Sequence, residues 1–422
     1  MSVLERLGSS FLRGTPEGIY SVCSAHPLVL EAAVRQAVRD NTPLLVEATS
    51  NQVNQLGGYT GMRPRDFREF ALRIAIAHGL AEENLILGGD HLGPNPWQNL
   101  PAEEAMRLAE MMVAEYSAAG FSKIHLDASM ACHGEQAPLP DNIVAQRAAR
   151  LCRAAERASG GDRRYYVIGT EVPIPGGATE SLAELQVTTR EHAERTLQIH
   201  RETFAAAGLN DVWPRVIALV VQPGVEFNHD SVVDYVSDKT ADVRRLLCDA
   251  GGLVFEAHST DYQRPGAYQE LVRDGFAILK VGPALTFALR EALFALEGIE
   301  KELIPHDCCS HLAEVVERQM LLHPQHWSKH YHGTAEEQRL LRRYSYSDRI
   351  RYYWTDSEIK AAVECLLQNL QSVTIPETLL SAALPQQYRA VRSGALQPEP
   401  YELLIHRIQQ AIAPYAAACL SH

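Results

Sequence analysis

The stretch LILGGDHLGP, residues 85–94, contains the pattern on which most of the chain is built. A short apolar run ends in an acid, a histidine and turn residues, which is typical of a buried strand reaching the edge of a parallel sheet. Seven similar runs occur in the first 285 residues, and the full set comprises 19–24, 44–48, 85–88, 123–126, 165–169, 216–221, 253–256 and 277–281. The sequence therefore predicts a sheet of eight strands.

The intervals between most of these runs have apolar residues at helical spacing, at 28–39, 65–78, 102–119, 141–158, 190–207 and 243–247. Strands that alternate with helices predict βα units and a parallel sheet. Eight such units predict a closed (β/α)8 barrel, because that number of strands closes around a side-chain-filled interior. A doubly wound open sheet is the alternative, but no G-x-G-x-x-G motif follows the first predicted strand.

The sequence changes character near residue 300, where aromatic, arginine and histidine residues become frequent. We expect residues 1–295 to form the barrel and residues 296–422 to form a helical extension, with helices at 310–322, 335–343, 357–370 and 400–418. No Ser/Gly-rich linker separates the two parts. The extension is therefore expected to pack on the barrel rather than swing free.

Composition excludes several classes of protein. The 422 residues carry a formal net charge of −13, which argues against general binding of nucleic acid or anionic membranes. The longest apolar runs fall far short of the roughly 20 residues of a membrane span, and residues 1–14 lack the apolar core of a secretory signal. The eight cysteines form no C-x-x-C pair. We therefore expect a soluble cytoplasmic protein with reduced thiols.

Arginine and tyrosine residues cluster at 342–354. Base stacking on nucleic acid is one interpretation of this cluster, but the net charge favours packing against the barrel, with an arginine that could reach a phosphate. No P-loop, H-R-D or D-F-G motif occurs, so no nucleotide cofactor is expected. The H-E-x-x-H and G-x-S-x-G motifs are also absent.

Ionisable residues follow five of the predicted strands, and the ends of barrel strands converge on one cavity. They are Glu47, Asp90, His91, Asp127, Glu171 and His258. Two neutral imidazoles and a carboxylate suit zinc or a similar divalent ion, so His91, His258 and Glu47 are the candidate ligands. Such an ion would polarise a substrate carbonyl, while Asp90, Glu171 or Asp127 would act as general acid or base. Hydrogen-bonded loop residues without a catalytic function are the alternative interpretation.

Further polar residues near the strand ends are candidates for substrate binding. They are Asn51, Gln222, Ser259, Asp261, Lys280, Gly282 and Thr286. Gly282 and Pro283 open a predicted helix, whose free N–H groups and dipole suit a phosphate; a plain turn-to-helix cap is the alternative. Lys123, His125 and Asp127 alternate on the fourth strand and share one face. They form either a polar layer beneath the site or a structural network.

The strand ends also match a known family as a set. The matching segments are VCSAHPL (22–28), EATSNQV (47–53), GGYTGM (57–62), LGGDHLGP (87–94), KIHLDAS (123–129), IGTEVP (168–173), VQPGVEF (221–227), EAHSTDYQ (256–263), KVGPALTFALRE (280–291), and YSYSDR (344–349) with RYYW (351–354). They resemble the Z-type subunit of D-tagatose-1,6-bisphosphate aldolase. The resemblance implies a class II aldolase-like barrel and a role in the catabolism of galactitol, N-acetylgalactosamine or related sugars.

In that family the Z-type chain accompanies a catalytic Y-type subunit and supports its activity and stability. The expected partners are therefore a Y-type subunit and a ketohexose phosphate, with self-association left open. A kinase activity, sometimes assigned to such chains, is not expected because nucleotide motifs are missing.

The catalytic class II aldolases hold zinc with three histidines, one of which directly follows a catalytic aspartate. Asp90 and His91 look like that pair, and His258 looks like the histidine after strand seven. The histidine expected after strand six is absent, since Gln222 stands near that position, so Glu171 or another group would be the third ligand. A second function then stands beside the accessory one: metal-dependent C4 epimerisation of tagatose 6-phosphate and fructose 6-phosphate, or of the free ketohexoses, by retro-aldol cleavage and re-addition.

Overall fold

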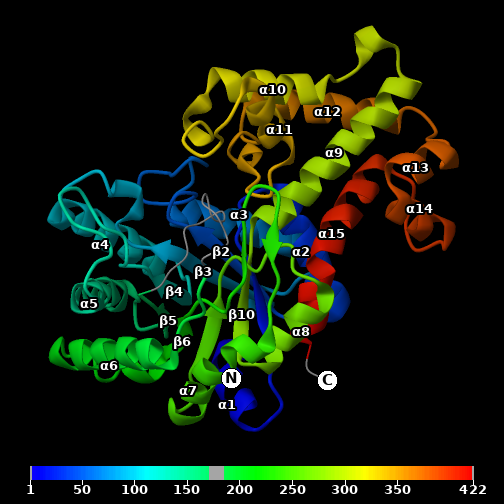
Figure 1. The fold of residues 1–422 in the computed structure, drawn as a ribbon. Helices are drawn as coiled ribbons and strands as arrows, with labels where there is room; N and C mark the ends of the chain where they lie inside the picture. The colour runs from blue at the N-terminus through cyan, green and yellow to red at the C-terminus, as the bar shows by residue number, and fades with distance from the viewer. Residues whose placement is uncertain (1, 171–184, 421–422) are drawn as a thin grey trace.

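The computed structural model describes residues 2–170 and 185–420. Eight parallel strands close into a barrel in the order β1-β10-β9-β6-β5-β4-β3-β2 (Figure 1). The strands are β1 (Ile19–Val22), β2 (Leu44–Thr49), β3 (Leu85–Leu92), β4 (Lys123–Leu126), β5 (Tyr165–Ile168), β6 (Val216–Val220), β9 (Val254–Ala257) and β10 (Phe276–Val281). Each overlaps one of the eight predicted runs, and the predicted (β/α)8 barrel is confirmed.

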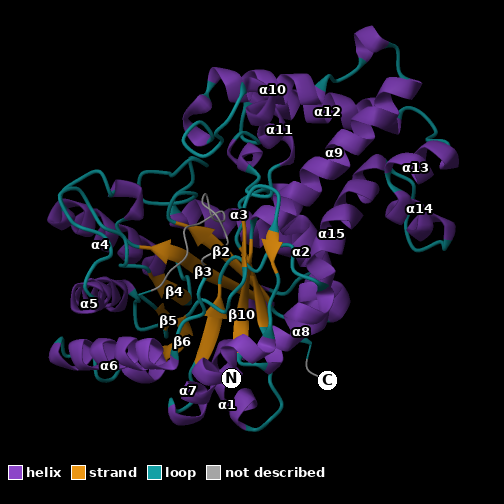
Figure 2. Cartoon of the chain, viewed as in Figure 1, coloured by secondary structure: helices purple, strands orange, loops and turns teal. Residues whose placement is uncertain are grey.

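Helices cover the outside of the barrel (Figure 2). They are α2 (Pro27–Asp40), α3 (Pro64–Ala77), α4 (Ala102–Ala118), α5 (Asp141–Ala158), α6 (Arg190–Ala206), α7 (Ala241–Asp249), α8 (Pro265–Arg273) and α9 (Pro283–Leu303). In α4, buried residues such as Ala105, Ala109 and Met112 recur at three- and four-residue spacing, which places one apolar face on the sheet. No helix within residues 2–170 and 185–420 is long and apolar enough to cross a membrane.

A helix that the sequence analysis did not anticipate, α1 (Val3–Leu12), packs against the amino-terminal ends of the strands. Its Leu4 and Leu7 join an apolar cluster with inward-facing strand residues such as Ile19 and Leu45. Side chains alternate along a strand, so Glu47 follows Leu45 on the inner face, one layer nearer the carboxyl end of β2. The barrel interior is therefore apolar at one end and polar at the other.

The C-terminal residues form α10 (Leu312–Leu322), α11 (Ala335–Tyr344), α12 (Ser357–Gln371), α13 (Glu377–Ala383), α14 (Pro385–Arg392) and α15 (Pro400–Cys419). Four of them overlap predicted helices, whereas α13 and α14 were not expected. Helix α15 packs against α2, α8 and α9, and Figure 1 shows α10, α11 and α12 beyond the carboxyl ends of the strands. The extension thus packs on the barrel, while the boundary at residues 295 and 296 stays a prediction.

A short antiparallel pair, β7 (Glu226–Phe227) with β8 (Val232–Val233), lies in the segment after β6. Phe227 of this pair is fully buried and contacts Tyr262, with ring centroids 5.3 Å apart. The pair thereby adds an apolar wall to the end of the barrel where the polar layer lies.

Candidate active site

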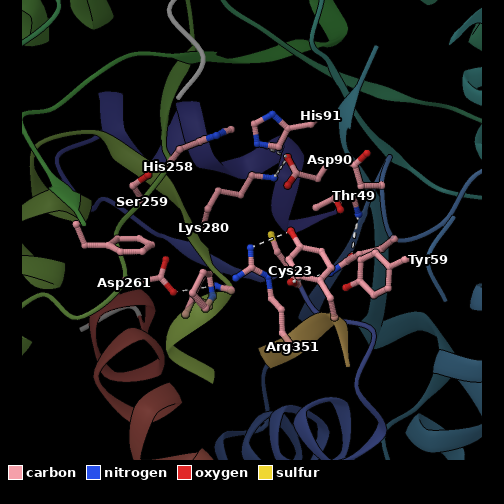
Figure 3. A pocket seen from close by; sticks show the side chains of 17 residues that line it. Cys23, Thr49, Tyr59, Asp90, His91, His258, Ser259, Asp261, Lys280 and Arg351 are labelled. Carbon is pink, nitrogen blue, oxygen red and sulfur yellow. Dashed lines mark hydrogen bonds and ion pairs between the residues drawn. The ribbon is translucent and has the colours of Figure 1, made fainter. Parts of the chain in front are cut away.

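A polar cavity of about 80 Å³ lies at the carboxyl ends of the strands. Its wall includes Cys23, Thr49, Asp90, His91, His258 and Lys280 (Figure 3). These residues come from β1, β2, β3, β9 and β10 or directly follow them. The convergence of strand ends that the sequence predicts therefore places ionisable side chains around one cavity.

Strand β3 is irregular where it carries Asp90 and His91. Its pairing with β4 shifts register between Gly89 and Leu92, and His91 has a left-handed φ of 48°. A bulge of this kind re-aims side chains. Ser259, which follows β9, is also left-handed, with a φ of 52°. Such backbone strain persists where the surrounding structure enforces it, and it concentrates at functional sites.

Two lysines lie among three carboxylates inside the barrel. Lys123 Nζ is 2.5 Å from Glu47 Oε1 and 2.7 Å from Glu256 Oε2. Lys280 Nζ contacts the other Glu47 oxygen and lies 2.5 Å from Asp90 Oδ1. All five side chains are buried. Burial disfavours the charge on Lys280, but the carboxylates outweigh it, Asp90 foremost, and raise the pKa of this ammonium well above its usual value.

Three histidine rings adjoin this network, with centroids 5.0–5.1 Å apart. Each ring has one nitrogen beside a carboxylate oxygen. The pairs are His91 Nδ1 with Asp127 Oδ2 (2.9 Å), His125 Nδ1 with Asp90 Oδ1 (3.1 Å) and His258 Nε2 with Glu256 Oε1 (2.8 Å). Carboxylates hold metal-binding histidines in this way, because the contact fixes the ring and leaves the other nitrogen for the ion.

The donor set fits a divalent cation. Asp90, His125, Glu256 and His258 each place one ligand atom within 4.8 Å of the others. His125 Nδ1 accepts a hydrogen bond from the backbone N–H of His91 at 3.1 Å as well as facing Asp90, and only a ring whose proton moves to Nδ1 would present the Nε2 lone pair to an ion. This Nε2 atom is buried and has no hydrogen-bond partner in the described part of the chain. Nitrogen and carboxylate donors of this kind suit zinc and similar ions.

The charges of the cluster also favour a cation. Three carboxylates (Glu47, Asp90, Glu256) contact the two lysines, and a fourth, Asp127, contacts His91. Although burial opposes it, hydrogen bonding to His91 lowers the pKa of Asp127 to about 2. Burial lowers the pKa of His258 to about 3, so this ring is neutral. Even with a proton on His91, the described cluster keeps an excess negative charge, and uncompensated buried charge is costly.

The structure brings together only part of the expected ligand set. His258 belongs to the four-residue donor group, but His91 does not, although its ring lines the cavity. Glu47 belongs to a different group, with Cys23 and Asp90. His125 supplies the missing imidazole from inside β4. Glu171 lies outside the described residues, so its expected function stays a prediction.

Most of the expected substrate-binding residues line the polar cavity. They are Asn51, Ser259, Asp261, Lys280 and Gly282. Gln222 does not line it: its Oε1 accepts hydrogen bonds from the backbone N–H groups of Gly224 (2.8 Å) and Val225 (3.1 Å), which orders the loop after β6. The Thr286 hydroxyl donates to Asp348 in the extension.

Asp261 caps the N-terminus of α9. Its Oδ1 accepts hydrogen bonds from the backbone N–H groups of Gly282 (3.1 Å) and Ala284 (2.8 Å). Burial raises the pKa of this carboxyl group to about 6. A carboxylate of the chain itself therefore occupies the helix end where the sequence analysis placed a phosphate, and the cap geometry matches the alternative interpretation.

A second cavity, of about 440 Å³, adjoins the polar one. The two share six lining residues, namely Cys23, Gln52, Tyr59, Gly282, Pro283 and Arg351. The rest of the second wall is largely apolar and includes Phe70, Leu293 and Ile359. The sequence analysis named an arginine of the 342–354 cluster only in general terms. Which of its arginines enters the site depends on how the extension docks, and the sequence pattern does not contain that information.

Comparisons with known proteins agree with this architecture. A family described as "D-tagatose-1,6-bisphosphate aldolase subunit GatZ/KbaZ-like" matches residues 4–420. The crystal structure of a Sinorhizobium meliloti 1021 protein, a probable tagatose 6 phosphate kinase by name, is 50% identical, with a TM-score of 0.89 over 95% of this chain and 100% of that chain. The fructuronate-tagaturonate epimerase UxaE from Cohnella laeviribosi is 13% identical, with a TM-score of 0.50 over 94% of this chain and 81% of that chain, and shares the fold.

Proposed function

The chain belongs to the GatZ/KbaZ-like family of D-tagatose-1,6-bisphosphate aldolase subunits, and from this premise we propose that it also carries out chemistry of its own. The proposed reaction is C4 epimerisation of a ketohexose phosphate, which interconverts D-tagatose 6-phosphate and D-fructose 6-phosphate. One observation carries the proposal: the buried donor group of Asp90, His125, Glu256 and His258 adjoins an open polar cavity. A subunit that only stabilised a partner would have no use for such a costly cluster.

The substrate class follows from the relatives. The family description names a tagatose phosphate, and the name of the Sinorhizobium meliloti relative includes tagatose 6 phosphate. Phosphoryl transfer from a nucleotide is not proposed, because the sequence has no P-loop, H-R-D or D-F-G motif. Epimerisation needs neither a nucleotide nor a second substrate.

Retro-aldol chemistry changes the configuration at C4 without any redox step. When the C4 hydroxyl loses its proton, the oxygen forms a carbonyl with C4 and the C3–C4 bond breaks. The electron pair of the C3–C4 bond passes to the C2 carbonyl, which gives an enediolate. C4 becomes the aldehyde carbon of glyceraldehyde 3-phosphate. After the aldehyde rotates, the enediolate adds to its other face, and the proton returns to the C4 oxygen. Atoms and electrons balance within the one substrate.

A divalent cation held by Asp90, His125, Glu256 and His258 would polarise the C2 carbonyl and lower the cost of the developing negative charge. His91, held at Nδ1 by Asp127, has Nε2 available to take the C4 hydroxyl proton and return it. The Lys280 ammonium lines the same cavity and supplies a fixed positive charge. The sequence predicts His91 as a metal ligand and Asp90 as the acid or base. This proposal exchanges the two functions, because Asp90 belongs to the four-residue donor group and His91 does not.

The test uses the purified chain alone with tagatose 6-phosphate, in the presence of Zn²⁺, Mn²⁺ or a chelator, and measures fructose 6-phosphate. We expect turnover with a metal, and loss of turnover with the chelator or on His258→Ala. His306→Ala is the matched control, because this histidine is exposed and lines neither cavity. Absence of turnover with every metal would refute the proposal.

A second candidate function is support of a catalytic Y-type aldolase subunit. The description of the family as a subunit supports it, and so do exposed apolar side chains on two helices of the extension. Leu321 and Leu322 of α10 are 52% and 62% exposed, and Leu340 and Tyr344 of α11 are 57% and 56% exposed. Exposed apolar patches mark interaction sites. Co-expression with a Y-type chain should give a complex that Leu322→Asp weakens and Leu12→Asp, an equally apolar exposed site on α1, does not. Failure to bind or stabilise that chain would remove this candidate.

A further inference from the structure

We propose that Arg351, from the C-terminal extension, binds the phosphate group of the substrate and makes the site selective for phosphorylated ketohexoses. The inference rests on the proposed function and deepens it. Arg351 belongs to the short 3-10 helix Arg349–Tyr352, between α11 and α12. Figure 3 shows its side chain directed from that segment toward Cys23 and Lys280 in the cavity.

The first argument compares the positive groups at the site. Lys280 and Arg351 are the lysine and arginine that line the polar cavity. Lys280 is committed to Asp90 and Glu47. The N-terminus of α9 is committed to Asp261. By contrast, no carboxylate oxygen among residues 2–170 and 185–420 forms an ion pair with Arg351.

None of the hydrogen-bond partners of the guanidinium is a carboxylate, although Asp348 and Asp261 lie near enough for their charges to interact with it. Its Nη1 atom donates to the backbone oxygens of Ser347 and Asp348, and Nη2 donates to the Tyr352 hydroxyl at 3.1 Å. The Tyr352 ring lies below it, with 4.6 Å between the guanidinium carbon and the ring centroid. These neutral partners orient the side chain. Arginine is the residue that best matches the geometry of a phosphate, because its planar fork donates to two oxygens at once.

The second argument is the position of Arg351 at the junction of the two cavities. The polar cavity, of about 80 Å³, is smaller than the roughly 300–1,000 Å³ of common ligand pockets. A ketohexose phosphate bound at the histidines must therefore extend into the adjoining cavity of about 440 Å³. Its phosphate, at the opposite end from the ketone, would pass the guanidinium on that path.

The third argument is that the segment carrying Arg351 is fixed to the barrel. Asp348 accepts a hydrogen bond from the Thr286 hydroxyl and lies 3.7 Å from Arg290 Nε, both on α9. The Tyr262 hydroxyl donates to the backbone oxygen of Tyr346 at 2.7 Å. An anchor held in this way loses little conformational entropy when the ligand binds. The extension therefore completes the substrate site.

The test measures binding by calorimetry rather than turnover alone, with D-fructose 6-phosphate and D-fructose as probes of the full-length, metal-loaded chain. Charge-assisted hydrogen bonds predict that Arg351→Gln weakens binding of the 6-phosphate by about 10- to 100-fold. Binding of fructose should fall much less, and Arg351→Lys should recover part of the loss. Arg349→Gln is the matched control, because Arg349 lies on the same 3-10 helix, bonds the His326 backbone oxygen and lines neither cavity.

The inference is overturned if Arg351→Gln binds the 6-phosphate as tightly as the wild type, or if both sugars lose affinity equally. It is also overturned if Arg349→Gln gives the same loss, since the arginines would then only maintain the segment, or if the wild type binds no ketohexose 6-phosphate. A wild type that binds the 6-phosphate through Arg351 and does not convert it would refute the proposed epimerisation and leave the phosphate anchor standing.

Discussion

His125 Nδ1 lies 3.1 Å from Asp90 Oδ1 on the neighbouring strand, and the other nitrogen of the same ring is buried without a hydrogen-bond partner in the described part of the chain. A buried polar atom is costly unless something binds it. Nδ1 also accepts from the His91 backbone N–H, so a cation would satisfy the second nitrogen once the ring proton lies on Nδ1, and it would balance the excess carboxylate charge around Lys123 and Lys280. The metal interpretation of the barrel therefore centres on His125.

His125→Ala and His258→Ala should each weaken binding of Zn²⁺ by more than about 100-fold, because removing even a residue behind a ligand costs about 10- to 100-fold. His91→Ala should retain the metal and lose turnover. Competition titration with a chromophoric chelator measures both effects. If His91→Ala loses the metal and His125→Ala keeps it, the result contradicts the donor group of the structure and supports His91 as a ligand, as predicted from the sequence.

Lys123→Met should lower the free energy of unfolding by about 3–5 kcal/mol, because it leaves Glu47 and Glu256 buried without this counter-charge. Urea denaturation measures the change. Arg65→Met is the control: Arg65 is 85% exposed in its pair with Glu69, which is 58% exposed, and pairs at the surface contribute about 0–1 kcal/mol. If both substitutions lower the free energy of unfolding equally, the buried network does not stabilise the protein in the way proposed.

Asp261 predicts a specific dependence of stability on pH. Burial raises the pKa of this carboxyl group to about 6, against about 3.9 in an unfolded chain. A carboxyl that holds its proton more tightly when folded stabilises the protein fully below the unfolded pKa, and this stabilisation is lost as the pH rises through the folded pKa.

Asp261→Asn keeps an acceptor for the N–H groups of α9 and does not titrate. The free energy of unfolding of the variant minus that of the wild type should therefore increase by up to about 3 kcal/mol between pH 4 and about pH 7. Urea denaturation across this range measures it. A difference that stays constant or decreases over the range would contradict the raised pKa.

Gly88→Ala should destabilise the protein by about 1–3 kcal/mol and reduce turnover. A Cβ atom at this position would lie 2.7 Å from Glu47 Cγ and 2.8 Å from Glu47 Oε1, so Glu47 must move away from the lysines. Gly298→Ala is the matched control, since a Cβ there meets nothing within 4 Å on the exposed side of α9; it should stabilise by up to about 1 kcal/mol. Thermal unfolding and the epimerisation assay give both readouts, and a neutral Gly88→Ala would refute the argument.

The barrel was predictable because strand and helix patterns are local. The run at 85–88 continues into Asp90 and His91, so the position after a strand was enough to select this pair for the site. Asp90 and His258 were found in this way, whereas Lys280 lies within the last predicted run; all three line the cavity.

The functions of His125 and Glu256 were harder to predict because both lie inside strands. Whether an inward-facing strand residue reaches the site depends on the stagger between strands, and on the bulge in β3, neither of which a hydrophobic pattern encodes. Gln222 was misplaced for a related reason, since its side chain bonds its own loop. Whether Arg351 reaches the site depends on how a segment about 70 residues beyond Lys280 docks on the barrel.

The most direct test of the central claim is incubation of the purified, metal-loaded chain with tagatose 6-phosphate in D₂O, followed by NMR of the product. Retro-aldol cleavage keeps the hydrogen on C4 throughout, because that carbon becomes an aldehyde and never a carbanion. We predict fructose 6-phosphate with hydrogen, and no deuterium, at C4. Deuterium at C4, or no fructose 6-phosphate at all, would contradict the account.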